Sequence, residues 1–175
     1  MIVLTGPSGS GKSTLIERIL KRFDDVSGYR TRRETGEKTA FYLVPIKPER
    51  DLPAAPFLTF VDHRARFFPD AFHLAAAGSV LQDSRLIILD EVGGLELTSE
   101  VIFDWLMQLK DSPALLLMVF KSDENCRRLL AKAELSPEAE DLLWARRTAL
   151  LAGVGRIYDV DDAAQLLAYL ADRLA

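Results

Sequence analysis

A chain of 175 residues with 49% hydrophobic and 27% charged residues is long enough to bury a sizeable core, and we predict one domain over residues 1–175. The net charge of −4 disfavours a dedicated nucleic-acid-binding protein, which normally carries a basic excess. No apolar run reaches the roughly 18–20 residues of a membrane span, and the single cysteine, Cys126, excludes an intrachain disulfide. We therefore expect a cytoplasmic protein with neither membrane nor nucleic acid as a partner.

Short apolar runs alternate with helical patterns along the first half of the chain, as in α/β proteins with a largely parallel sheet. A strand at 2–5 leads into a helix from about Ser13, whose apolar residues recur at helical spacing. The runs SGYRT and TAFYLVPI flank a polar segment with a Thr-Gly turn signal, which predicts a hairpin. KPERDLPAAP is typical of an exposed loop, FLTFV of a short strand, and 69–81 of a helix.

The second half continues the same alternation. RLIILD is apolar on both faces, as a central parallel strand must be, and Thr98 or Ser99 can cap a helix that runs to about Lys110. ALLLMVF predicts another buried strand, followed by helices at about 123–133 and 137–151, the strand GRIYDV and a helix at 162–174. The whole pattern predicts a three-layer α/β fold, with helices on both faces of a mainly parallel, twisted sheet.

Residues 6–13 read GPSGSGKS, a complete G-x-x-x-x-G-K-[ST] phosphate loop placed between a strand and a helix. The glycines permit backbone conformations closed to other residues, and the N–H groups of the loop form an anion nest at the start of the helix. Lys12 is placed to reach the β- and γ-phosphates, and the Ser13 hydroxyl to coordinate Mg²⁺. The predicted binding residues are Gly6, Pro7, Ser8, Gly9, Ser10, Gly11, Lys12, Ser13 and Thr14.

Two adjacent carboxylates follow the buried run RLIIL. Asp90 lies at the carboxyl end of that strand, where ligands bind in open α/β sheets, and can hold a water of the Mg²⁺ shell. Glu91 can orient or deprotonate the attacking water, or else cap a helix or pair with an arginine. Adjacent Asp-Glu is typical of P-loop proteins that have a catalytic glutamate and an extra strand between the loop strand and the aspartate strand. Residues 14–85 have room for that strand.

Three segments together resemble a known family: GPSGSGKST, SGYRT (Gly28, Tyr29 and Thr31) and LDEVGGLEL (Asp90, Glu91, Val92, Gly93, Leu95, Glu96 and Leu97). They are similar to the small nucleoside-triphosphatases of archaea and bacteria that have a human cancer-related relative. The resemblance covers roughly residues 1–120. It implies a RecA-like P-loop core with a catalytic glutamate and slow hydrolysis of several nucleoside triphosphates to diphosphates, although some members are described as nucleotide kinases.

Other residues have two interpretations each. A cation that stabilises charge on the γ-phosphate is usually required. The candidates for this cation are Arg30, Arg32, Arg33, Lys121, Arg146 and Arg147. For each of them a solvated surface position is the more ordinary interpretation. Lys121 stands out because it directly follows the strand ALLLMVF. Glu96 can order the site or pair with a base. The dense phenylalanines either line a nucleoside pocket or pack as core or lid: Phe57, Phe60, Phe67, Phe68 and Phe72.

Three functions therefore compete. The first is Mg²⁺-dependent hydrolysis of nucleoside triphosphates, with Lys12 and Glu91 as catalytic residues and Ser13 and Asp90 at the metal. The second is a nucleotide or small-molecule kinase, which needs an acceptor pocket and a mobile lid that excludes water. The third is a nucleotide-binding switch without catalysis, whose bound state a partner recognises.

Overall fold

The computed structural model describes residues 1–47, 55–81 and 83–175. The strands are β1 (Ile2–Leu4), β2 (Val26–Thr35), β3 (Thr39–Pro45), β4 (Leu58–Val61), β5 (Arg64–Phe67), β6 (Leu86–Val92), β7 (Leu115–Phe120) and β8 (Arg156–Tyr158). The α-helices are α1 (Lys12–Arg22), α2 (Pro69–Ser79), α3 (Glu100–Lys110), α4 (Asp123–Leu130), α5 (Pro137–Leu151) and α6 (Ala163–Leu174). Two 3₁₀ turns complete the order, η1 (Leu95–Thr98) and η2 (Val160–Asp162).

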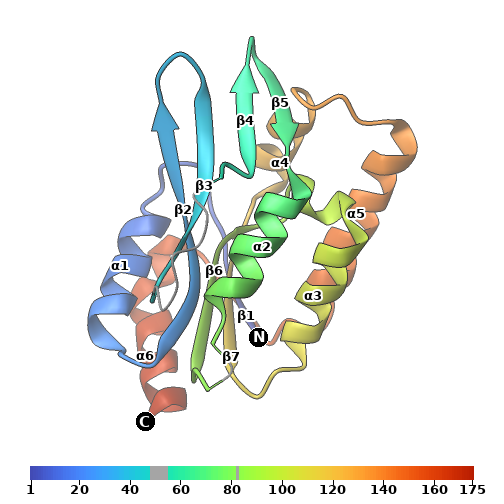
Figure 1. The fold of residues 1–175 in the computed structure, drawn as a ribbon. Coiled ribbons are helices and arrows are strands. Elements are labelled where there is room, and N and C mark those ends of the chain that lie inside the picture. The colour runs from blue at the N-terminus through green and yellow to red at the C-terminus, as the bar shows by residue number, and fades with distance from the viewer. Residues whose placement is uncertain (48–54, 82) are drawn as a thin grey trace.

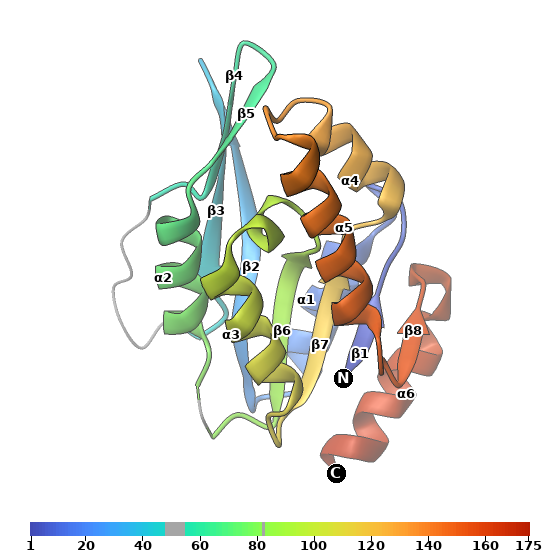
Figure 2. The same cartoon turned by 90° about the vertical axis from the view of Figure 1, so that its right-hand side faces the viewer.

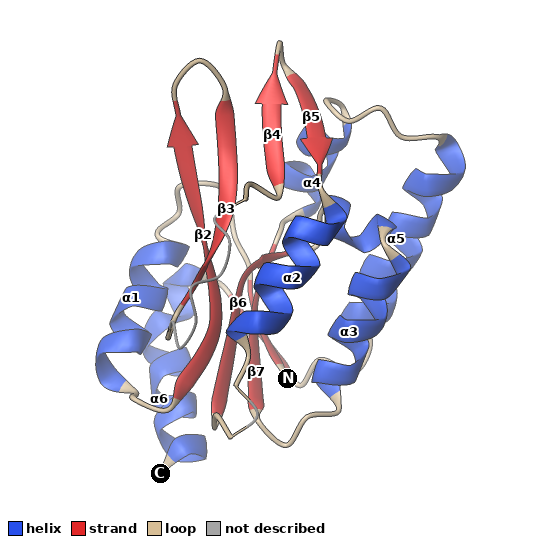
Figure 3. Cartoon of the chain, in the orientation of Figure 1, coloured by secondary structure: helices blue, strands red, loops and turns tan. Residues whose placement is uncertain are grey.

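The described strands form a single sheet in the order β5-β4-β3-β2-β6-β7-β1-β8. Neighbouring strands in the part β2-β6-β7-β1-β8 pair in parallel. Neighbouring strands in the part β5-β4-β3-β2 pair antiparallel. The two antiparallel hairpins extend beyond the helical layers (Figures 1 and 3). The sheet is thus mixed, with a parallel centre and an antiparallel extension.

Helices cover both faces of the sheet, which confirms the predicted three-layer arrangement. Helices α1 and α6 lie on one face, and α2, α3, α4 and α5 on the other (Figure 2). Because side chains alternate along a strand, β6 contributes to two separate cores: Leu86 and Ile88 pack with α1 and α6, whereas Ile87 and Leu89 pack with α2 and α3. Strands buried on both faces need apolar residues at every position, which is why the run from Leu86 to Leu89 shows no alternation.

One expectation about strand order is wrong. The strand that separates β1 from β6 is β7, which follows Asp90 in the chain, and it is not supplied by residues 14–85. The strands within 14–85 lie elsewhere because β2 pairs with the opposite edge of β6, and β3, β4 and β5 continue outward from β2. An extra strand therefore exists between the loop strand and the Asp90 strand, but it comes from ALLLMVF.

Other expectations hold with adjusted boundaries. The hairpin between SGYRT and TAFYLVPI is present, with β2 extended to Thr35. Helices α2 and α4 end at Ser79 and Leu130, before the expected ends, and most of the loop KPERDLPAAP lies outside the described residues. Strand β5 is an addition, joined to β4 by a tight turn in which Asp62 and His63 have φ values of 48° and 66°. None of the described helices is long and apolar enough to cross a bilayer.

Candidate active site

The loop between β1 and α1 has the conformation that its glycines predict. Gly6, Gly9 and Gly11 have φ values of 138°, 78° and 100°, in the region that side chains disfavour. Gly11 precedes α1 and has no side chain to cap the helix, so the first N–H groups of α1 are left without a capping side chain. The Lys12 ammonium donates to the carbonyls of Gly6 and Pro7, at 2.9 and 2.7 Å, and lies across the loop. A helix N-terminus without a capping side chain and one cation therefore lie on the same loop, an arrangement that suits an anion.

A cavity of about 400 Å³ opens over this loop. Its lining includes Lys12 and Ser13 from the start of α1 and both Asp90 and Glu91 from the end of β6. Residues almost eighty positions apart meet here because β1 and β6 run parallel with only β7 between them, so their carboxyl ends share one edge of the sheet. The other lining residues are Ser8, Gly9, Gly11, Thr14, Thr31, Arg33 and Phe41. Of the predicted loop residues, Gly6, Pro7 and Ser10 do not line the cavity.

Asp90 lies in an environment that disfavours its charge. Its relative exposure is 8%, and Thr31 donates a hydrogen bond from its hydroxyl to the backbone carbonyl of Asp90. Desolvation by burial, and then the neighbouring carboxylate of Glu91, raise the pKa of Asp90 to about 6, although Thr31 and Lys12 act in the opposite direction. A cation next to this carboxylate would favour its ionised form.

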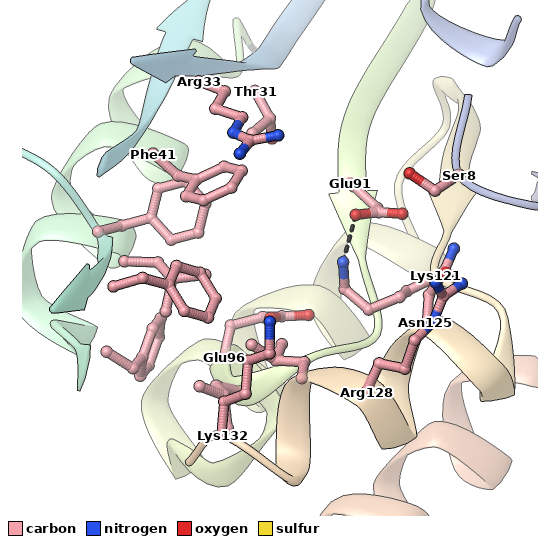
Figure 4. A pocket seen from close by; sticks show the side chains of 16 residues that line it. Ser8, Thr31, Arg33, Phe41, Glu91, Glu96, Lys121, Asn125, Arg128 and Lys132 are labelled. Carbon is pink, nitrogen blue, oxygen red and sulfur yellow. Dashed lines mark hydrogen bonds and ion pairs between the residues drawn. The ribbon is translucent and has the colours of Figure 1, made fainter. Parts of the chain in front are cut away.

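Glu91 forms an ion pair with Lys121, which directly follows β7 (Figure 4). The two side chains are 26% and 19% exposed, so water screens the pair only in part. The Lys121 backbone N–H donates to the carbonyl of Val92 at 2.8 Å, which ties the ends of β6 and β7 together. The sequence predicts Lys121 at this end of the sheet, and the structure places its ammonium beside the carboxylate of Glu91, the candidate general base.

Glu96 orders the turn that follows β6. It is 5% exposed, and its Oε1 accepts hydrogen bonds from the backbone N–H groups of Gly93 and Gly94, at 2.5 and 2.7 Å. Burial raises its pKa, and these two bonds partly oppose that shift. Of the two interpretations of Glu96, the structure favours the ordering one, since backbone donors occupy Oε1.

For Arg147, the surface interpretation is wrong. It is only 3% exposed, donates to the carbonyls of Gly93 and Lys121, and pairs with Asp123 at 2.8 Å. It thereby connects the residues that follow β6 with those that follow β7. Nothing in the sequence distinguishes it from its neighbour Arg146, because burial here depends on which carbonyls the fold brings to that face of α5.

The segment SGYRT has a structural explanation. Gly28 has a φ of 107°, and a Cβ atom built on it would lie 2.0 Å from the Ile88 carbonyl oxygen on β6. Tyr29 is fully buried against Phe72, and Thr31 bonds the Asp90 carbonyl. The segment therefore joins β2 closely to β6 and fixes the position of Asp90.

A second cavity, of about 510 Å³, adjoins the first on the far side of Glu91. The two share Ser8, Thr31, Arg33, Phe41 and Glu91. The remaining walls carry aromatic and basic side chains and three leucines, together with Glu96 and Asn125 (Figure 4). The phenylalanines divide accordingly: Phe57, Phe60 and Phe67 line this cavity, whereas Phe72 is buried core.

Comparisons with known proteins agree with this architecture. A protein-family model described as NTPase matches residues 1–141. The chain belongs to this NTPase family. Nucleoside-triphosphatase THEP1 of Thermotoga petrophila is 29% identical over 118 residues, 63% of this chain and 66% of that protein, and THEP1 of Thermococcus kodakarensis is 30% identical over 115 residues, 56% and 63%. The chain thus spans about two thirds of the length of these relatives.

The family's fold is also seen in a crystal structure. THEP1 from Aquifex aeolicus matches with a TM-score of 0.62 over 97% of this chain and 98% of that one, at 20% identity. A pig guanylate kinase is 28% identical over 97 residues, 51% of this chain and 48% of that protein. The structural match shows that the α/β arrangement with a mostly parallel sheet is that of a THEP1 P-loop protein.

Proposed function

We propose that the protein hydrolyses nucleoside triphosphates to diphosphate and phosphate with Mg²⁺ as its cofactor. The observation that carries this proposal is the single cavity in which Lys12, Ser13, Asp90 and Glu91 meet over the phosphate loop. Membership of the NTPase family and the names of the THEP1 relatives support the same activity.

Each group has a distinct role in the proposed reaction. The loop N–H groups and Lys12 bind the phosphates. Glu91 orients a water for in-line attack and accepts its proton, so that the new bond forms between the water oxygen and the γ-phosphorus while the bond to the β–γ bridging oxygen breaks. Lys121 holds the Glu91 carboxylate and offers a cation on the γ-phosphate side.

The residues present fit Mg²⁺. This ion prefers oxygen ligands and keeps several waters, so that a hydroxyl and a carboxylate suffice beside the phosphates. Ser13 supplies the hydroxyl and Asp90 the carboxylate, both in the lining of the loop cavity. The ion would neutralise phosphate charge and polarise the γ-phosphoryl group.

The test is incubation of purified protein with each triphosphate and Mg²⁺, alone, with EDTA, and with candidate acceptors. Diphosphate and free phosphate in equal amounts without acceptor, abolished by EDTA, support the proposal. Label transferred to an acceptor would favour a kinase instead. Tight triphosphate binding with neither product would favour a switch module and overturn hydrolysis.

A further inference from the structure

We propose that the 510 Å³ cavity beyond Glu91 is a binding site for a second nucleotide, a nucleoside monophosphate, distinct from the triphosphate on the loop. The volume lies within the roughly 300–1,000 Å³ of small-molecule sites. The inference rests on the proposed function only in one respect, namely that the γ-phosphate end of the bound triphosphate points toward Glu91.

The wall of the cavity opposite Glu91 and Lys121 is aromatic. Phe41 and Phe60 meet edge to face with ring centroids 5.8 Å apart, and Phe41 stands across the cavity from Glu91 and Lys121 in Figure 4. Phe57 and Phe67 also line the cavity, although each packs on the core at its other side. Aromatic faces that border an open space suit a planar ring, such as a nucleobase, that can stack on them.

Cations stand at the two ends of this wall. The Arg33 guanidinium lies 5.9 Å from the Phe41 ring centroid, and the Lys132 ammonium lies 5.6 Å from that of Phe60. Within residues 1–47, 55–81 and 83–175, neither side chain forms an ion pair with a carboxylate. The next arginine in line, Arg128, is by contrast paired with Glu124. Each end of the wall thus offers one cation, which could bind the phosphate of a nucleoside monophosphate whose base stacks on the aromatic rings.

Polar groups that could fix the orientation of a base are also present. Asn125 accepts from Arg128 through Oδ1, and its amide N–H groups donate to none of the residues that the structure describes, so a ligand can accept from them. The pocket is held in shape from outside, because the Ala65 N–H of β5 donates to the Lys132 carbonyl at 2.7 Å. This bond attaches the end of the α4 segment to the second hairpin.

The position of the cavity separates it from the base of the triphosphate. Ser8, early in the loop, and Glu91 line both cavities, whereas Ser13 and Thr14, later in the loop, line only the smaller one. In the proposed function, Lys12 and the general base Glu91 both act at the γ-phosphate. The larger cavity, which Glu91 also lines, therefore begins beyond the γ end of the triphosphate. The nucleoside of the triphosphate lies at the other end of the phosphate chain, and a molecule beyond Glu91 is therefore a second ligand.

The test is calorimetric titration of GMP, AMP, CMP and UMP into protein saturated with AMP-PNP and Mg²⁺. We expect at least one of them to bind with a stoichiometry near one. The double variant Arg33→Ala/Lys132→Ala should weaken that binding at least ~10-fold, the effect of losing charge-assisted hydrogen bonds. Arg32→Ala is the matched control, because Arg32 is adjacent on β2, lines neither cavity and pairs with Glu34 at 3.1 Å; its effect should be under ~2-fold.

The corresponding nucleoside and ribose 5-phosphate should each bind at least ~10-fold more weakly than the monophosphate, since each lacks one of the two recognised groups. Failure of all four monophosphates to bind, displacement of AMP-PNP by the monophosphate, or unchanged affinity in the double variant would each overturn the proposal. If AMP-PNP itself does not bind, the proposed function fails instead. The monophosphates are then titrated into Lys12→Ala protein without AMP-PNP. Binding that is lost when Arg33→Ala and Lys132→Ala are added still supports the second site, and no binding overturns the proposal.

Discussion

Adjacent carboxylates at the end of β6 have different surroundings, and these imply different roles. Asp90 is 8% exposed and lines only the loop cavity, as Ser13 does, whereas Glu91 lines both cavities and pairs with Lys121. A buried carboxylate near a hydroxyl suits a metal shell, and a more exposed one that borders open space suits a water.

We expect Glu91→Gln to slow hydrolysis by at least ~10²-fold while triphosphate affinity stays within a few-fold, because the amide keeps the size but cannot accept the proton. Asp90→Asn should lower both the rate and the affinity for the Mg²⁺-bound nucleotide. Steady-state kinetics and direct binding on both variants make the comparison. Near wild-type hydrolysis by Glu91→Gln would show that Glu91 is structural and that another group orients the water.

Lys121 should act on the rate more than on binding. Lys121→Met removes the cation that we propose for the γ-phosphate side, and we expect hydrolysis to fall by ~10²-fold, as for other single transition-state donors. Lys121→Arg should restore much of the rate, because it restores the charge beside Glu91. If the methionine variant instead raised KM with kcat unchanged, Lys121 would bind ground state and transition state equally.

At the scale of the elements, the sequence predicts what local pattern determines. The run from Leu86 to Leu89 is apolar at every position, so a central strand that leads to Asp90 follows from the local pattern alone. β5 was not predicted because a four-residue alternation with arginines at two positions gives too weak a signal, and only its pairing with β4 makes it a strand. The place of β7 between β1 and β6 is likewise a tertiary fact that no local pattern contains.

Of the candidate site, the sequence predicts the loop, the carboxylates and the place of Lys121, but it does not predict the contacts made by Arg147 and Thr31. The buried role of Arg147 depends on carbonyls that follow two different strands, Gly93 and Lys121. The bond from Thr31 to the Asp90 carbonyl depends on the register of β2 against β6. Such partners are far apart in the chain, and only the fold brings them together.

Arg147 provides a test of this connection between elements. Arg147→Met leaves two carbonyls without their donor, and we expect the free energy of unfolding to fall by about 2–4 kcal/mol. Arg18→Met, on the exposed side of α1, is the control and should change it by no more than about 0.5 kcal/mol. Chemical denaturation followed by circular dichroism measures both, and equal midpoints for the two variants would contradict the structural role.

At the scale of the whole molecule, binding at the loop should stabilise the fold. AMP-PNP with Mg²⁺ at 100 times its Kd adds about 2.7 kcal/mol by mass action, which raises Tm by roughly 5–10 °C for a domain of this size. Lys12→Ala should fold normally, because the hydrogen bonds of Lys12 within the described part of the chain go to loop carbonyls, and it should lose the shift. Scanning calorimetry with and without nucleotide tests this, and an undiminished shift in Lys12→Ala would refute the phosphate-loop assignment.

The two outermost strands of the sheet are both short and both carry arginine. β5 presents Arg64 and Arg66 and is partly covered by the bridge from Ala65 to Ala133, and β8 is three residues long and begins with Arg156. An open sheet otherwise ends in unpaired N–H and C=O groups that invite strands from other chains. Here, the arginines and the short length of β5 and β8 disfavour the addition of strands from other chains at the two edges of the sheet. Fibril-like growth from these edges is therefore disfavoured.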